Sequence, residues 1–179
     1  FRFQISNLFI SSMAEITNSN LYHLDAGILP KDACVVIVRT EWNAAIVDKL
    51  EEGCRQVLTE NKVAFRVITV PGAFEVPFAI SAYWNAHLQY ESQPDAFIAL
   101  ACVVRGGTPH FDYVCKGITD GIVQLNLSLP IPSVFGVLTV DTNEQAEERT
   151  GGIHGHKGEE AAITALKMIA LKASFNKNI

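Results

Sequence analysis

Residues 96–110 read AFIALACVVRGGTPH. An unbroken apolar run fills 96–104, and a glycine-rich turn separates it from His110. A short, uncharged run of this kind is typical of a strand buried on both faces of a sheet. After the turn, apolar residues recur at the spacing of three to four that is typical of a helix. The stretch therefore predicts a strand over 96–104, a ligand-accessible turn, and a helix over 110–127.

The same alternation of apolar run and amphipathic segment continues in both directions along the chain. Further strands are predicted at 33–38, 65–70 and 133–139, and further helices at 43–61, 73–90, 143–149 and 157–174. One face of the first helix is predicted to carry its apolar residues, namely Ala45, Ile46, Leu50, Val57 and Leu58. Continuous apolar strands that alternate with helices favour a parallel sheet covered on both faces. We expect an α/β fold, a three-layer α/β/α sandwich with a four-stranded parallel sheet, in a single domain.

Composition narrows the class of function. Of the 179 residues, 49% are hydrophobic and 18% are charged, against about 25% charged in an average domain. This deficit indicates surface that is covered in an oligomer. The net charge of −5 without a basic run argues against nucleic-acid binding. The four cysteines form no C-x-x-C pair, which favours reduced thiols and a cytoplasmic location.

Two segments need separate interpretation. Residues 121–140 are uncharged and nearly long enough to span a bilayer, but polar residues and prolines interrupt them, so we expect a helix end, a turn and a strand, and no membrane binding. Residues 1–12 precede Met13 and are apolar, with one arginine and no acid. We interpret them as translated upstream sequence, a cloning remnant or a targeting segment, which leaves organellar import open. The expected division is an N-terminal extension over 1–30 and one domain over 31–179.

Ligands of open parallel sheets bind at the carboxyl ends of the strands. That rule singles out four segments, which are Thr40–Asn43, Pro71–Glu75, Arg105–His110 and Thr139–Asn143. Polar and small residues gather in these segments. We therefore expect the functional site there.

The segment after the strand at 96–104 has the most informative residues. Gly106 and Gly107 permit close approach of a ligand, and free N–H groups at the helix start suit a phosphate. Thr108 adds a hydroxyl donor, and the imidazole of His110 can take and give a proton near neutral pH. The alternative is a plain turn with His110 as a capping residue on the surface.

The two earlier segments are weaker on their own. Gly72 and Ala73 permit a close ligand, and Glu75 is suited to sugar-like hydroxyls, although it would also complement a helix dipole. Trp42, directly after a strand, is suited to stacking on a flat heterocycle, although core packing is the alternative.

Residues near the C-terminus offer charge. Arg149 is suited to a phosphate, although an arginine after two glutamates is also typical of a surface ion pair. The sequence His154-Gly155-His156 suggests a metal, but the adjacent Lys157 would repel a cation, the glycines are expected to make the loop at 150–156 flexible, and no third ligand is apparent. No metal site is predicted.

Taken together, these segments resemble lumazine synthases. The matching motifs are VPGAFEVP at 70–77, VVRGGTPHFDYV at 103–114, FGVLT at 135–139, and EQAEER at 144–149 followed by KG at 157–158. The resemblance covers about Val35 to Ala173 and implies a flavodoxin-like fold. It also implies condensation of 5-amino-6-(ribitylamino)uracil with 3,4-dihydroxy-2-butanone 4-phosphate. The products would be 6,7-dimethyl-8-ribityllumazine, phosphate and water, formed without a metal or an organic cofactor.

The resemblance also assigns roles to residues. It implies that the pyrimidine and its ribityl chain contact Trp42, Asn43, Gly72, Ala73, Phe74, Glu75, Val103 and Val104. Arg105, Gly107 and Thr108 would bind substrate, the last two at the phosphate, and His110 would shuttle protons. Phe135, Arg149 and Lys157 match residues that a neighbouring subunit supplies within a pentamer. The short spacing before Lys157 is compatible with a 60-subunit shell, and riboflavin synthase is a candidate partner.

Three other interpretations compete with this one. They are a flavodoxin-like or nucleotide-binding domain, a catalytically weak family member that acts as a riboflavin-binding shell, and a purely structural oligomer. The full set of implied site residues favours the enzyme over both non-enzymes.

Overall fold

The computed structural model describes residue 21 and residues 29–88 and 93–175. Its central sheet contains β1 (Cys34–Thr40), β2 (Ala64–Val70), β3 (Ala96–Val104) and β4 (Ser133–Val140). All pairings are parallel, in the order β2-β1-β3-β4. The chain leaves β1 toward one side for β2 and returns to the other side for β3. The carboxyl ends of β1 and β3 therefore flank the switch point at which ligands of such sheets bind.

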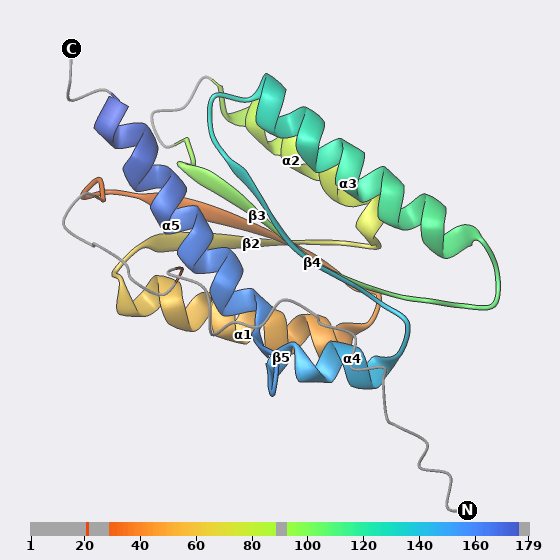
Figure 1. The fold of residues 1–179 in the computed structure, drawn as a ribbon. Helices are drawn as coiled ribbons and strands as arrows, with labels where there is room; N and C mark the ends of the chain where they lie inside the picture. Colours follow the sequence, from red (N-terminus) through yellow and green to blue (C-terminus); the bar gives the residue numbers. More distant parts are fainter. Residues whose placement is uncertain (1–20, 22–28, 89–92, 176–179) are drawn as a thin grey trace, which may run out of the picture.

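Helices cover both faces of the sheet, as Figure 1 shows. One face carries α1 (Ala44–Glu60) and α5 (Lys157–Phe175), and the other carries α2 (Val76–His87) and α3 (His110–Ser128). Successive strand residues point to opposite faces, so β1 supplies Val35 and Ile37 to one core cluster and Val36 and Val38 to the other. The predicted three-layer α/β sandwich with a four-stranded parallel sheet is confirmed.

Glycines allow α1 and α5 to approach closely. A Cβ atom at Gly158 would lie 1.9 Å from the Leu50 carbonyl oxygen, and one at Gly53 would lie 2.3 Å from the His156 ring. Leu50 and Gly53 belong to α1, whereas His156 ends the short strand before α5 and Gly158 is the second residue of α5. This contact fixes the first turn of α5 on the middle of α1.

Three local expectations were wrong. Ala45 is exposed and Val47 is buried instead, because the buried stripe of α1 begins at Ile46. The helix predicted from residue 73 begins as a 3-10 turn, η3 (Ala73–Glu75), and α2 starts only at Val76. The loop at 150–156, expected to be flexible because of its glycines, forms a small antiparallel hairpin of β5 (Thr150–Gly152) and β6 (Gly155–His156).

α2 ends at His87, and residues 89 and 90 of the predicted helix lie outside the described residues. The other boundaries agree within two residues, and the short helix is α4 (Asn143–Glu148). The uncharged segment 121–140 forms the end of α3, a turn and β4, as predicted. Within the described ranges, no helix is long and apolar enough to span a membrane. The extension predicted over 1–30 lies almost entirely outside the described residues.

Candidate active site

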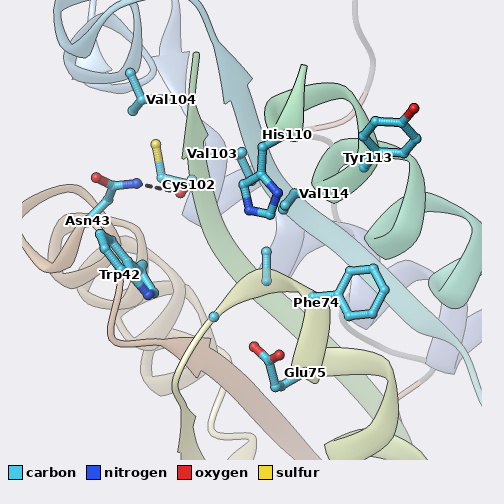
Figure 2. Close-up of a pocket in the computed structure, with 12 residues that line it drawn as sticks. Trp42, Asn43, Phe74, Glu75, Cys102, Val103, Val104, His110, Tyr113 and Val114 are labelled. Atoms are coloured by element: carbon cyan, nitrogen blue, oxygen red, sulfur yellow. Dashed lines mark hydrogen bonds between the residues drawn. The ribbon is translucent and has the colours of Figure 1, made fainter. Parts of the chain in front are cut away.

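A cavity of about 590 Å³ opens at the carboxyl ends of β1 and β3. Its walls come from the turn after β1, the η3 turn after β2, the end of β3 and the first turns of α3 (Figure 2). The lining residues are Trp42, Asn43, Gly72, Ala73, Phe74, Glu75, Cys102, Val103, Val104, His110, Tyr113 and Val114. Most of the site residues expected from the sequence are thus brought together in one place.

Trp42 and Asn43 form the wall nearest β1. The Trp42 side chain is 72% exposed, so it does not pack in the core and its ring is free to meet a ligand. Asn43 has a left-handed backbone with φ of 56°, which asparagine tolerates better than most residues. Its Nδ2 donates to the Cys102 carbonyl oxygen at 2.7 Å. This hydrogen bond ties the turn after β1 to β3 and fixes the position of Trp42.

The η3 turn supplies the opposite wall. A Cβ atom at Gly72 would lie 2.9 Å from Glu75 Oε2 and 3.5 Å from Trp42 Cδ1, so a larger residue would displace the Glu75 carboxylate and touch the Trp42 ring. Phe74 packs against α3, where a Cβ atom at Gly117 would lie 2.4 Å from its ring. The exposed Glu75 carboxylate lies on the cavity wall, where it can accept hydrogen bonds from hydroxyl groups (Figure 2).

His110 is the first residue of α3, and its ring projects into the cavity (Figure 2). The turn before it, with Gly107 and Thr108, is exposed and lies outside the set of lining residues. A Cβ atom at Gly106 or Gly107 would meet no atom within 4 Å. The turn therefore leaves open space beside its backbone at the rim, next to His110.

Arg105 also lies outside the lining set. Its guanidinium is hydrogen-bonded to Asp141 and Asp112. The structure thus directs this side chain toward two carboxylates rather than into the cavity.

Three lining residues were not expected from the sequence. Tyr113 and Val114 share a face of α3 with His110, since positions three and four apart on a helix are neighbours; this spacing was a usable signal. Burial raises the pKa of the Cys102 thiol to about 11, so Cys102 is a neutral wall rather than a nucleophile. Cys115 does not line the cavity, and its pKa is raised first by desolvation and then by Asp112.

Phe135, Arg149 and Lys157 do not join this cavity. Phe135 and Lys157 line a second pocket of about 510 Å³ beside β4 and α5. Arg149 Nη2 donates to both Glu160 carboxylate oxygens at 3.1 and 3.2 Å, and Lys157 Nζ lies 3.4 Å from Glu160 Oε2. With side chains 18% and 13% exposed, Arg149 and Glu160 form a partly buried pair, unlike the solvent-exposed pair considered as an alternative. Glu160 was missed because the fold brings its main partner, Arg149, from the C-terminal end of α4.

The two histidines near Lys157 have other contacts. His154 Nε2 lies 3.6 Å from Glu148 Oε2, and His156 Nδ1 accepts a hydrogen bond from the Glu159 N–H at 3.4 Å, which caps α5. Among the residues that the structure describes, no group of three or more His, Cys, Asp or Glu side chains is arranged to hold a metal ion.

An open parallel sheet with a partly polar cavity at its switch point defines a ligand-binding α/β protein of the doubly wound class. The family model for 6,7-dimethyl-8-ribityllumazine synthase matches residues 32–173, and the chain belongs to this family.

Relatives with the same name cover most of the chain. The 6,7-dimethyl-8-ribityllumazine synthase of Porphyromonas gingivalis is 48% identical over 158 residues, which are 86% of this chain and 95% of the relative. That of Parabacteroides distasonis is 45% identical over 86% of this chain and 96% of the relative. That of Xanthomonas campestris is 40% identical over 83% and 96%, respectively.

Proposed function

We propose that this chain is a transferase of riboflavin biosynthesis. It condenses 5-amino-6-(D-ribitylamino)uracil with 3,4-dihydroxy-2-butanone 4-phosphate to give 6,7-dimethyl-8-ribityllumazine, phosphate and water. The observation that carries the proposal is the cavity in which Trp42, Glu75 and His110 meet, in a chain that belongs to the lumazine synthase family. The steps are imine formation between amine and ketone, elimination of phosphate, and ring closure.

The cavity walls suggest how the pyrimidine substrate binds. Trp42 stacks on the flat ring, because its face is exposed at the cavity. Asn43 and the backbone of Val103 and Val104 orient the heterocycle from the ends of β1 and β3. The ribityl hydroxyls bind along the η3 turn, where Glu75 accepts hydrogen bonds. Gly72, Ala73 and Phe74 shape this part of the site.

The phosphorylated ketone binds at the rim. Gly107 has open space beside it and Thr108 is exposed, both just before the start of α3, and free N–H groups at a helix N-terminus favour an anion. His110, beside them, transfers protons during imine formation and elimination. Among the described residues that line the cavity, however, none is a lysine or an arginine. A dianionic substrate therefore needs a cation from elsewhere.

A second copy of the chain supplies that cation. We infer that Phe135, Arg149 and Lys157 of one subunit complete the cavity of its neighbour, with Arg149 at the phosphate and Lys157 at a pyrimidine carbonyl. Large apolar side chains on α2 and α3 are exposed in the single chain, which suits a subunit interface. They include Phe78, Tyr113, Val123 and Leu127.

When each subunit completes the site of the next one around a closed ring, the ring that we propose is a pentamer. Twelve pentamers would make a 60-subunit shell. Light scattering distinguishes these particles, and a pentamer-sized particle alone at micromolar concentration would argue against the shell. Riboflavin synthase stays a predicted partner. Cytoplasmic location also stays a prediction, supported by four free cysteines.

Most of the rate enhancement comes from holding two small substrates together, which is worth about 7–11 kcal/mol for well-oriented reactants. The test is to mix purified protein with both substrates and to follow the fluorescent product against a protein-free control, because the condensation also proceeds without catalyst. Product well above the control is expected. Background-level product from an assembled oligomer, together with quenching of Trp42 by riboflavin, would instead favour a riboflavin-binding shell.

A further inference from the structure

The turn Gly106–Pro109, which joins β3 to α3, has little support of its own. All of its residues are exposed, and a Cβ atom added at Gly106 or Gly107 would touch nothing within 4 Å. Such a turn has many accessible conformations, and ordering it when phosphate binds would weaken binding. Something at its ends must therefore fix its shape.

Arg105 occupies one end of the turn and makes several contacts. Its backbone N–H donates to the Val140 carbonyl oxygen at 2.9 Å. Its Nε donates to Asp141 Oδ1 at 2.7 Å, and its Nη1 donates to Asp112 Oδ1 at 3.2 Å. The guanidinium carbon lies 4.0 Å from the centroid of the Phe111 ring.

These contacts connect three elements. Phe111 and Asp112 lie in the first turn of α3, so Arg105 bridges from the end of β3 across the glycine turn to the helix start. Asp141 follows β4, and its backbone N–H donates to Gln145 in α4 at 2.8 Å. One side chain thus holds both ends of the turn and anchors them to the neighbouring strand end.

The local charge argues against a direct role in anion binding. One guanidinium and two carboxylates leave one net negative charge at this point. A phosphate that approached Arg105 would have to displace Asp112 or Asp141 from it. Because both carboxylates already bind its guanidinium, Arg105 is poorly suited to bind phosphate. It is well suited to hold the two ends of the turn together, and we call this set of contacts the clamp.

We propose that Arg105 is a positioning residue, whose bonds to Asp112 and Asp141 hold the Gly106–Pro109 turn and His110 in the shape that receives the phosphorylated ketone. This inference rests on the proposed function. It differs from the expectation that Arg105 contacts the substrate itself.

The test compares Arg105→Met, Asp112→Asn and Arg105→Lys with the wild type. Lys116→Met, which removes an exposed ion pair with Asp120 on the same helix, is the matched control. Steady-state kinetics give kcat and both KM values, and amide hydrogen exchange reports on the peptide that contains the turn.

Arg105→Met and Asp112→Asn are both expected to raise the KM for the phosphorylated ketone on the order of tenfold, the effect of losing one charged hydrogen bond. The KM for the pyrimidine should stay close to the wild-type value, amide exchange in the turn should become faster, and Arg105→Lys should recover part of the loss. Lys116→Met should change none of these quantities.

Two results would overturn the proposal. If Arg105 contacted the phosphate directly, Asp112→Asn would free the guanidinium and lower the KM for the ketone. If exchange became faster with both KM values unchanged, Arg105 would only support the fold.

Wild-type protein without turnover would refute the proposed function and not the clamp. Inorganic phosphate then serves as the probe. If the clamp is right, phosphate slows exchange in the turn of the wild type but not in that of Arg105→Met; equal slowing in both proteins would contradict it.

Discussion

Among the described residues that line the cavity, His110 is the one histidine, and it stands at the start of α3 beside the open glycine turn. Imidazole is a side chain suited to general acid–base catalysis. The neighbours of His110 on the cavity wall are mostly apolar, together with Asn43 and Glu75. We therefore propose that proton transfer by His110 adds to catalysis that depends mainly on holding the substrates together.

His110→Ala is expected to lower kcat by a factor on the order of 10²–10⁴, the usual range for general acid–base catalysis, without reaching the uncatalysed rate. The measurement is steady-state turnover of the assembled variant. His87→Ala, which alters a histidine near the end of α2, is the control and should keep wild-type turnover. Complete loss of catalysis in assembled His110→Ala would show that proximity contributes less than we propose.

Arg149 is predicted to act on one substrate only. Arg149→Ala should raise the KM for the phosphorylated ketone by about 10- to 150-fold, since a hydrogen bond to a charged group contributes about 1.5–3 kcal/mol. The KM for the pyrimidine should change little. Arg55→Ala, which removes an arginine paired with Glu51 on α1, is the control. An unchanged KM for the ketone would remove Arg149 from the phosphate site.

The sequence predicted well which residues line the cavity where the position of a residue relative to the strands was sufficient. Trp42, Glu75 and His110 lie in the segments that connect strands to the following helices, and the carboxyl edge of a parallel sheet brings such residues together. The sequence predicted poorly which partner a charged side chain contacts when the possible partners lie on separate elements. Arg105 turns to Asp112 and Asp141, and Glu160 pairs with Arg149, because the fold determines which charges meet.

At the scale of elements, the alternation of apolar runs with helical spacing located every strand of the main sheet and every α-helix that the structure describes. The hairpin of β5 and β6 was not predicted because strands of three and two residues are too short to show an alternating pattern. Its glycines suggested flexibility, but Gly151 and Gly155 take positive φ values of 104° and 78°, which shape the turn.

The contact between α1 and α5 makes a prediction about stability. Gly158→Ala should destabilise the protein by about 1–3 kcal/mol, the usual cost of overpacking a tight contact, because its Cβ atom would meet backbone of α1 that cannot rotate away. Thermal or denaturant unfolding measures the change, and Gly106→Ala, whose Cβ atom meets nothing within 4 Å, is the control for stability. Equal stability of Gly158→Ala and wild type would show that α5 shifts freely on α1.

At the scale of the whole molecule, the low charge content and the arrangement of the site residues both support the proposed oligomer. Charged residues make up only 18% of the chain, and apolar side chains on α2 and α3 stand exposed in the single subunit. The cavity is lined by Trp42 and His110, whereas Lys157, and Arg149 that shares its partner Glu160, lie beside a different pocket of the same chain. Composition could suggest an oligomer, but only the fold shows that the two groups of residues are separate.

Combining two impaired variants in one assembly shows whether the active site is shared between subunits. His110→Ala and Arg149→Ala are produced separately and together, with different affinity tags, and turnover is measured for each parent and for the purified hybrid. If each site takes His110 from one subunit and Arg149 from its neighbour, about one quarter of the sites in an evenly mixed ring are intact. A shared active site should give the hybrid a turnover far above the mean turnover of the two parent variants. Turnover no greater than that mean would contradict an active site shared between subunits.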